Sequence, residues 1–578
     1  MESSKNIISP YGGELRNLVV SPERAAELKT LSKNWPSWDL TPRQECDLEQ
    51  LLNGGFSPLE GFLNHSDYES VCDNMELADG MLWPIPIQLD LPDALASQLK
   101  TGESLTLRDA EGVMLAVLHI ESIWKPDKLA EAEKVYGTTD LNHKGVAHLL
   151  ERTHDCYVGG KIEGFQLPQH YDNRALRHSP AELRAEFAKR GWNKVAAFHT
   201  RSIMHRVHRE LTMRALHEQD TKLLIHPVVG SSQPGDIDHY ARVRCYKHVL
   251  PHYPANTATL SLLSLSTRMA GPRETLWHAL VRRNYGCSHF IVGPDHAGTS
   301  HGKTGEPFYD PDAARALVKE VGERTGMTIV PSEKLVFSEE KDNYIPQSEV
   351  NAGGNVLSIS EHDLQSRLQA GEEIHDWFSY PEVIDELKRI HPPKSEQGFT
   401  LLLSGFSGSG KSTIARVLLS RMLEIGGRSV TLLDGDLVRK NLSSELSFSK
   451  EHRNLNVMRI GFVANEITKN GGVAICAPIA PYAEIRDALR EQISANGGFI
   501  LVHVATSLET CEARDRKGFY AKARAGIIPE FTGISDPYDV PENAEVVIHT
   551  ENQTPEESAR EILLYLAREG YITLPGEP

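Results

Sequence analysis

The chain has 578 residues, a length that predicts about four domains at roughly 150 residues each. Hydrophobic residues make up 40% and charged residues 24% of the sequence, proportions that exclude a disordered or fibrous protein. Asp and Glu outnumber Lys and Arg by 79 to 61, and the resulting net charge of −18 argues against a general affinity for nucleic acid or an anionic membrane.

The sequence lacks membrane, export and disulfide signals. No apolar run is long enough for a transmembrane helix, and the stretch Met1–Leu15 does not have the features of a secretory signal. The seven cysteines are scattered and never form a CxxC pair, so neither a disulfide framework nor a structural zinc site is expected. We expect a cytoplasmic protein whose cysteines are all buried apolar residues.

Predicted elements follow a clear order along the first two thirds of the chain. Short alternating runs up to about residue 170 predict a strand-rich region. Beyond it, apolar strands alternate with amphipathic helices, which predicts a parallel sheet with helices on both faces. The expected strands are 194–198, 222–229 and 289–292, and the expected helices are 204–218 and 274–285.

A polar region, 338–355, and a helical tail, 360–390, come next. The segment His391-Pro392-Pro393-Lys394-Ser395 is the clearest linker, because consecutive prolines block both a helix and a strand ladder. After it, the apolar run 399–403 opens a second α/β region that extends nearly to the end of the chain.

A glycine-rich loop follows this strand and precedes the amphipathic helix 414–423. It has the spacing G-x-x-x-x-G-K-[ST] in a strand–loop–helix context. Glycines let successive N–H groups point at phosphates, and the helix N-terminus adds positive potential. Lys411 would neutralise β- and γ-phosphate oxygens, and the Ser412 hydroxyl would help to hold Mg²⁺. The loop therefore predicts ATP binding by Gly405, Ser407, Gly408, Ser409, Gly410, Lys411, Ser412 and Thr413.

Charged residues after the loop indicate a second substrate. Asp434 and Asp436 end the next predicted strand, and beside a nucleotide such a pair suits Mg²⁺ organisation and acceptance of a hydroxyl proton. On their own they would be a solvated turn. Arginines, an asparagine and a lysine further along suit a ligand that bears phosphate or sulfate: Arg439, Arg453, Asn456 and Lys522.

Residues 396–578 resemble adenylylsulfate (APS) kinase. The resemblance is carried by the loop above and by stretches that begin at Leu433, Phe448, Lys522, Phe531 and Pro537. It implies transfer of the γ-phosphoryl group of ATP to the ribose 3′-hydroxyl of APS, giving PAPS. Asp436 would be the base, Ser412 would bind Mg²⁺ with Asp434 acting through water, and APS would contact Asp434, Asp436, Arg439, Phe448, Arg453, Asn456, Ile479, Lys522, Phe531 and Ile534. Ala480 stands where kinases of this family often carry a phosphorylatable serine, which excludes a phosphoenzyme there.

An Arg- and His-rich segment joins a predicted strand to a helix at residues 198–209. His205 and His208 are three residues apart and share a helical face. With Arg201 they would form a cationic cluster at a helix N-terminus, suited to a polyphosphate whose α-phosphorus is attacked in line. A surface helix that carries histidines explains this segment equally well. A metal site would need a third ligand, and the sequence does not indicate one.

Residues 1–390 resemble ATP sulfurylase of the type that has a C-terminal kinase-like domain. Matching stretches are 54–61, 226–230, 234–239, 268–274 and 295–298. The resemblance implies catalysis by Thr200, Arg201, His205 and His208. It also implies sulfate and ATP binding by His199, Arg201, Ser202, Gly293, Asp295, His296, Ala297 and Leu335.

The chain departs from that family at two signatures. In Gln-Thr-Arg-Asn-Pro-x-His-x-x-His it has His199, Ser202 and Ile203, and in Gly-Arg-Asp-His-Ala-Gly it has Pro294 in place of arginine. An imidazole binds an anion well only when it is protonated. Loss of a guanidinium beside a triphosphate forfeits roughly 2–4 kcal/mol, or about 30- to 1,000-fold in rate. We expect a retained but modified adenylyl transfer, weakened or run in reverse.

The sequence therefore predicts a bifunctional α/β multidomain enzyme. Its domains would be an N-terminal β-rich, barrel-like domain (1–170), a Rossmann-like nucleotidyltransferase domain (171–330), a small α/β connecting domain with linker (331–395) and a P-loop kinase domain (396–578). The expected ligands are ATP, sulfate, APS, pyrophosphate, PAPS and Mg²⁺, without nucleic acid or membrane, and the expected assembly is a homo-oligomer, a dimer or a hexamer.

Three alternatives remain open. In the first, the chain is an APS kinase whose sulfurylase region is degenerate and structural. In the second, the C-terminal region binds PAPS as a regulator, as in fungal-type sulfurylases, but those have a damaged P-loop and this loop is intact. In the third, the chain is a nucleotide-sensing interaction protein without turnover.

Overall fold

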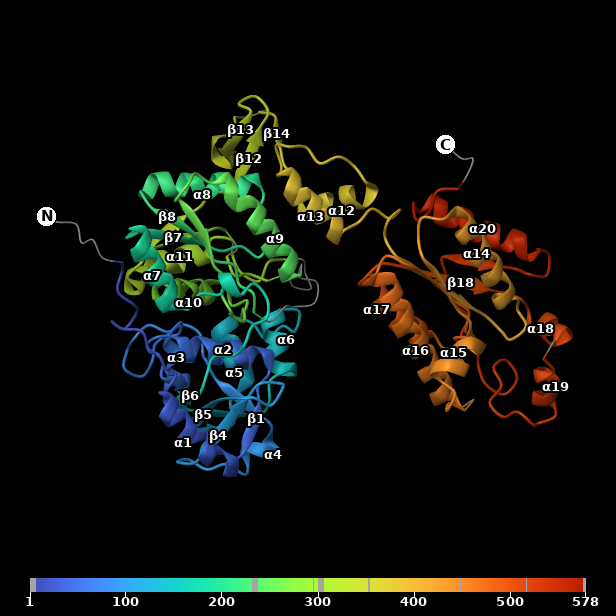
Figure 1. The fold of residues 1–578 in the computed structure, drawn as a ribbon, viewed down its shortest axis with the longest axis horizontal. Helices are drawn as coiled ribbons and strands as arrows, with labels where there is room; N and C mark the ends of the chain where they lie inside the picture. Colours follow the sequence, from blue (N-terminus) through green and yellow to red (C-terminus); the bar gives the residue numbers. More distant parts are fainter. Residues whose placement is uncertain are drawn as a thin grey trace. The chain divides into compact units, whose positions relative to one another are not determined.

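The computed structural model describes residues 7–230, 238–294, 296–299, 306–351, 354–447, 449–515 and 517–574. The chain forms two compact units: Met1–Ile359 with His375–Glu386, and Ser360–Ile374 with Leu387–Pro578 (Figure 1). None of the helices in the described ranges combines the length and apolar character that crossing a bilayer requires.

A six-stranded sheet occupies the first part of the N-terminal unit, with the strand order β1-β4-β5-β6-β2 and β3 beside β6. Its strands are β1 (Ser37–Asp39), β2 (Gly61–Phe62), β3 (Leu89–Leu91), β4 (Ser104–Arg108), β5 (Met114–Trp124) and β6 (Cys156–Gly164). The accompanying helices are α1 (Pro22–Leu31), α2 (Pro42–Asn53), α3 (His65–Asn74), α4 (Asp93–Ala96), α5 (Lys128–Tyr136) and α6 (Lys144–Glu151). The short strands expected before residue 170 are therefore present.

A second sheet has five strands in the order β11-β10-β7-β8-β9, all parallel. They are β7 (Val195–Phe198), β8 (Lys222–Ile225), β9 (Ala258–Leu260), β10 (His289–Val292) and β11 (Thr328–Pro331). The helices between and beside them are α7 (Pro180–Arg190), α8 (Arg206–Gln219), α9 (His239–Val249), α10 (Gly271–Asn284) and α11 (Ala313–Val321). The predicted strand–helix alternation is confirmed.

Two predicted bounds in this sheet need correction. Helix α8 begins at Arg206 rather than at Met204, because His205 is its N-cap and has extended backbone angles. Strand β8 ends at Ile225 rather than at Val229, since Pro227 has no N–H to donate to a strand ladder.

The region after β11 is more regular than its polar composition predicts. It contains an antiparallel sheet of β12 (Leu335–Ser338), β13 (Asn343–Pro346) and β14 (Val356–Leu357). The expected single tail is two helices, α12 (Glu361–Ala370) and α13 (Pro381–Ile390). Gly371, with φ of 72°, ends α12 in the left-handed conformation, and α13 stops just before the double proline as predicted.

A parallel sheet in the order β16-β17-β15-β18-β19 organises the C-terminal unit. Its strands are β15 (Phe399–Ser404), β16 (Val430–Leu433), β17 (Val473–Cys476), β18 (Gly498–Val504) and β19 (Val546–Ile548). The helices are α14 (Lys411–Ile425), α15 (Gly435–Leu442), α16 (Lys450–Lys469), α17 (Ala483–Ser494), α18 (Leu508–Arg514), α19 (Phe519–Arg524) and α20 (Pro555–Arg568). Separate apolar clusters pack α14 and α20, and α16 and α17, against this sheet.

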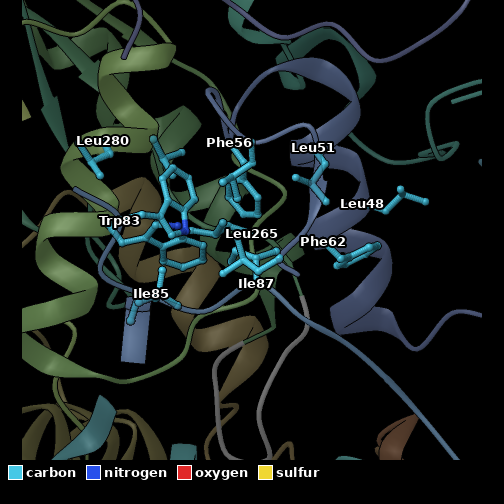
Figure 2. Close-up of a cluster of buried hydrophobic side chains, with 14 of the residues drawn as sticks. Leu48, Leu51, Phe56, Phe62, Trp83, Ile85, Ile87, Leu265 and Leu280 are labelled. Carbon is cyan, nitrogen blue, oxygen red and sulfur yellow. The ribbon is translucent and has the colours of Figure 1, made fainter. Parts of the chain in front are cut away.

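Helices α2 and α10 meet in one apolar core that is shared by the first two sheets. Figure 2 shows Leu48, Leu51 and Phe56 together with Leu265 and Leu280, and all five are buried. On α10, the neighbouring Trp277 ring lies 5.3 Å from that of Phe56. Helix α10 is therefore held from both sheets, which matters because it carries part of the site described below.

The seven cysteines are all free thiols. Six are buried, as the sequence predicts, but Cys46 is partly exposed, which corrects the expectation that all seven are buried.

Candidate active sites

A cavity of about 620 Å³ lies in the C-terminal unit, where β15, β16 and β17 end. Many residues predicted from the sequence line it: Ser407, Gly408, Gly410, Lys411, Ser412, Thr413, Asp434, Arg439, Arg453, Asn456, Ile479 and Phe531. The structure therefore brings the P-loop and the expected second-substrate residues to one place.

The P-loop has a backbone that glycine requires. Gly405 has φ of 155°, and a Cβ there would lie 2.6 Å from the carbonyl oxygen of Val504. Gly410 has φ of 106° at the N-cap of α14. The loop is also held from behind, because Thr506 and Thr550 donate their hydroxyls to the Ser409 carbonyl at 3.0 and 3.1 Å. The phosphate cradle is thus a fixed backbone shape.

Lys411 supplies a charge to this cradle. Its buried Nζ donates to the carbonyls of Gly405 at 2.8 Å and Phe406 at 2.7 Å. Burial lowers the pKa of Lys411 to about 8, which still leaves the ammonium largely charged at neutral pH. Its hydrogen-bond partners are neutral carbonyls, so phosphate oxygens can replace them.

Arg453 and Asn456 project from α16 into the same cavity. Arg453 donates to the Thr532 hydroxyl at 2.7 Å and to Asp536 at 2.8 Å, and the Tyr482 hydroxyl also donates to Asp536 at 2.7 Å. The Oδ1 atom of Asn456 is buried without a hydrogen-bond partner among the described residues. An orphaned acceptor on a cavity wall indicates a ligand that donates a hydrogen bond.

Four predicted residues do not line this cavity. Gly405 and Ser409 lie behind the cradle, Lys522 is exposed on α19, and Ile534 follows Phe531 in a turn. Phe448 and the side chain of Asp436 lie outside the described residues, although α15 contains position 436.

The second cavity lies in the N-terminal unit, where β7 and β10 end, and encloses about 470 Å³. The strand order reverses at this point, because β8 and β9 lie on one side of β7 and β10 lies on the other. The adjacent ends of β7 and β10 are therefore the position at which α/β proteins usually bind ligands. The predicted residues that line it are His199, Thr200, Arg201, Ser202, His208, Gly293, His296, Ala297 and Leu335. His205 is not on its wall, and Asp295 lies outside the described residues.

The histidines of this site are neutral, which corrects the predicted cationic cluster. His205 is buried with its Nδ1 atom 2.8 Å from the Ser379 hydroxyl, and burial lowers its pKa to about 3. Nδ1 of His208 accepts the backbone N–H of His205 at 3.1 Å, and burial lowers the pKa of His208 to about 4. Burial, and then nearby cations, also hold the pKa of His199 well below its usual value. Arg201 is exposed and charged, and donates to the carbonyl of Gly298 at 2.8 Å.

Sequence reasoning missed polar residues on α10. Glu274 and His278 line the second cavity, and the fully buried Arg282 donates to the carbonyls of His278 at 3.1 Å and His226 at 3.3 Å. Their spacing of four residues, repeated once, is a polar stripe in an otherwise buried helix, and that stripe is visible in the sequence. In the other cavity the missed lining residues include Arg514, Tyr520, Thr532 and Thr550.

Comparison with known protein families follows this division of the chain. A PUA-like domain model matches residues 8–167, an ATP-sulfurylase model matches residues 174–390, and an adenylylsulphate kinase model matches residues 397–549. The chain is therefore a multidomain α/β protein with a PUA-like N-terminal domain, an ATP-sulfurylase domain and a P-loop APS kinase domain.

Relatives align over nearly the whole chain. A sulfate adenylyltransferase of Aspergillus clavatus is 49% identical over 97% of this chain and 99% of its own length, and one of Neosartorya fischeri is 48% identical over the same shares. A solved structure described as a hexameric APS kinase from Thiobacillus denitrificans is 38% identical, covers 98% of this chain and 100% of its own, and has a TM-score of 0.81. The chain belongs to the sulfate adenylyltransferase family.

Proposed function

We propose that the chain catalyses two consecutive steps of sulfate activation. ATP and sulfate give APS and pyrophosphate in the N-terminal cavity, and APS and a second ATP give PAPS and ADP in the C-terminal cavity. The observation that carries the proposal is the presence of two separate cavities at the ends of parallel strands. One is built around an intact P-loop, and the other around Arg201 and a group of imidazoles.

In the kinase cavity, the backbone of the P-loop and Lys411 hold the β- and γ-phosphates of ATP. Asn456, Arg453 and Phe531 hold APS. Asp436 accepts the proton of the APS 3′-hydroxyl as that oxygen bonds to the γ-phosphorus, while the bond from the γ-phosphorus to the β,γ-bridging oxygen breaks and ADP leaves. The hydroxyl of Ser412 and the carboxylate of Asp434 are hard oxygen donors on the same wall, so they fit Mg²⁺. When bound, Mg²⁺ would neutralise charge on the phosphate oxygens.

In the sulfurylase cavity, a sulfate oxygen bonds to the α-phosphorus of ATP while the bond from that phosphorus to the pyrophosphate oxygen breaks. Arg201 and His199 hold sulfate, Thr200 and Ser202 contribute hydroxyls, and the segment 293–297 contacts ATP. His208 acts as a neutral hydrogen-bond donor, and His205 positions the start of α8. The same geometry serves the reverse reaction, which forms ATP from APS and pyrophosphate.

We propose that the first sheet is barrel-like, that the order β11-β10-β7-β8-β9 makes the second sheet Rossmann-like, and that the four domains have the boundaries expected from the sequence. Free cysteines support a cytoplasmic location. The hexameric description of the Thiobacillus structure supports a homo-oligomer.

A second candidate function is APS kinase activity alone, with the sulfurylase region as a scaffold. One observation favours it: the Thiobacillus structure is described only as an APS kinase, although its whole chain is covered by this one. Pro294 also favours the kinase-only function, because it stands where the family signature has an arginine and so leaves the N-terminal cavity with one cation fewer.

Three assays on the purified full-length protein decide between these candidates: pyrophosphate release from ATP with sulfate, ATP formation from APS with pyrophosphate, and PAPS formation from APS with ATP. The bifunctional proposal expects all three activities. Arg201→Ala should lower the rates of pyrophosphate release and of ATP formation by about 30-fold or more and leave the rate of PAPS formation unchanged. If the wild-type protein shows neither pyrophosphate release nor ATP formation but does form PAPS, the kinase-only function is established.

A further inference from the structure

A line of polar side chains runs from the wall of the sulfurylase cavity into α10. Nε2 of His296 lies 3.2 Å from Nδ1 of His278, and Nε2 of His278 lies 3.4 Å from Oε1 of Glu274. Glu274 is fully buried, and its two oxygens accept the backbone N–H groups of Arg268 and Ala270 at 2.9 Å each. A fixed carboxylate thus stands at the far end of the line, and His296 stands at the cavity.

The carboxylate determines where the hydrogens of this line sit. Burial alone raises the pKa of Glu274, but His278 and the two N–H groups outweigh it and hold that pKa below its usual value. An ionised carboxylate only accepts hydrogen bonds. Nε2 of His278 is buried and forms no hydrogen bond of good geometry with the described residues, and Oε1 of Glu274 lies 3.4 Å from it. Because that carboxylate can only accept, we place the one hydrogen of neutral His278 on Nε2, facing Glu274.

The hydrogen on His296 follows from this arrangement. Because Nδ1 of neutral His278 has no hydrogen, it accepts one from Nε2 of His296. Neutral His296 then has no hydrogen left on its other ring nitrogen, Nδ1. As a neutral group it can offer that nitrogen only as an acceptor.

Charged and titratable groups surround the line, and the guanidinium groups of Arg282 and Arg201 favour its neutral form in the free site. Arg282 faces it from α10, Arg201 and His199 from the segment after β7, and His208 from α8; Glu333 and Lys334 line the same cavity. The His199 ring lies edge-on to His278 at 5.3 Å and to His296 at 5.7 Å. Burial lowers the pKa of His278, and Arg282 and Arg201 add to that effect, while Glu274 raises it without offsetting the fall. Burial, and then His278, Arg282 and Arg201, hold the pKa of His296 well below its usual range.

We propose that this line couples the binding of an oxyanion in the sulfurylase cavity to the uptake of one proton from solvent, which converts His296 to its imidazolium form. The inference rests on the proposed sulfurylase function, since sulfate is the oxyanion in question. A sulfate oxygen only accepts hydrogen bonds, so the bare Nδ1 of neutral His296 repels it. A proton on that nitrogen creates a charged donor, and Glu274 stabilises the added charge through His278. No bond of sulfate is made or broken in this step.

Calorimetric titration of the full-length protein with sulfate tests the coupling. Titrations between pH 6 and pH 8.5, in buffers that differ in ionisation enthalpy, count the protons taken up. We expect uptake that approaches one proton per sulfate, and an affinity that falls by about tenfold for each pH unit across this window. Binding with no proton uptake overturns the inference while leaving the sulfurylase function intact. If the protein neither binds sulfate nor shows activity in the two adenylyl-transfer assays, both the inference and the proposed sulfurylase function are overturned.

The variant His278→Asn separates the proton linkage from binding itself. An amide at position 278 can donate to Nε2 of His296, so that neutral His296 carries its hydrogen on Nδ1. Sulfate binding should then lose its pH dependence and become tighter than that of the wild type at pH 8.5, a gain that mere structural damage does not produce. His289→Asn, at the opposite end of β10, is the matched control and should keep the wild-type slope. If His278→Asn keeps that slope, the line is not the proton acceptor; if it does not fold, the wild-type titration decides alone.

Discussion

The two cavities receive anionic ligands by different means. The kinase cavity offers a charge that is present before the ligand arrives, on Lys411 and at the N-terminus of α14. The sulfurylase cavity places buried neutral imidazoles beside the exposed guanidinium of Arg201, and Lys334 also lines it. The comparison shows that residue type alone does not reveal charge, since burial decides whether an imidazole is a cation.

The strongest test of this difference between the two cavities is to remove the permanent charge of Lys411 from the kinase cavity. Lys411→Ala should lower the rate of PAPS formation by about 1,000-fold, because the ammonium neutralises charge on the phosphoryl group that is transferred. Pyrophosphate release from ATP with sulfate should not change. Lys469→Ala, at the exposed end of α16, serves as the control. Full PAPS synthesis by Lys411→Ala would contradict the kinase assignment.

The opposite change adds a fixed charge to the sulfurylase cavity. Pro294 lies exposed on its wall, so an arginine there displaces no buried side chain. Pro294→Arg should raise the rate of adenylyl transfer by about 30-fold or more, measured as ATP formation from APS and pyrophosphate. Pro294→Ala removes the ring without adding charge and should stay near the wild-type rate. Reversal of His199, Ser202 and Ile203 to Gln, Asn and Pro in the same chain should add to the gain.

Substitution of Asn456, a neutral residue of the kinase cavity, tests whether uncharged side chains also contribute to APS binding. Asn456→Leu removes the orphaned Oδ1 atom and should raise KM for APS by about tenfold without lowering the melting temperature. Asn465 is the matched control, because it is equally buried on α16 and its Oδ1 accepts the amide of Asn496 at 3.0 Å. Asn465→Leu should lower the melting temperature and leave KM unchanged. The reverse pattern would show that Asn456 is structural.

The smallest expected effect is on pH dependence. Below pH 8 the Lys411 ammonium is charged, and above its pKa of about 8 it loses its proton and its attraction for phosphate. Affinity for a non-hydrolysable ATP analogue should therefore fall by a few-fold as pH rises from 8 to 9, with proton uptake on binding. Lys411→Arg keeps its charge over this range and should show no such fall. A flat wild-type profile would mean that Lys411 titrates above this range.

The phosphate-binding loop of the kinase site could be predicted from the sequence, because the P-loop acts through backbone geometry that its glycines encode. The second-substrate part was predicted less completely, since Lys522 and Ile534 do not line the cavity and Arg514, Tyr520 and Thr532 do. Asn456 and Arg453 were also predicted correctly as cavity residues. The charge state of His205 and His208 could not be predicted, because it depends on burial by segments distant in the sequence, such as the one that carries Ser379. His205 was predicted on the helix face and is the N-cap instead, because the helix begins two residues later than predicted, and His205 does not line the cavity.

Residues on α10 were missed for a related reason. The sequence predicts a helix at 274–285, and that helix packs into the core shared by two sheets. Its polar stripe of Glu274, His278 and Arg282 was present in the sequence, but only the fold shows that the stripe faces a cavity and meets His296.

The path of the chain between its two compact units has a practical consequence. It leaves the first unit after Ile359, returns for His375–Glu386 and leaves again, so Ser379, the partner of His205, comes after the first departure. A fragment that stops at residue 359 would lack that hydroxyl, and one that stops at 395 would carry stretches that belong to the other unit. Dissection of this protein into its two halves by truncation is therefore a poor experiment, and point substitutions in the intact polypeptide are the better tool.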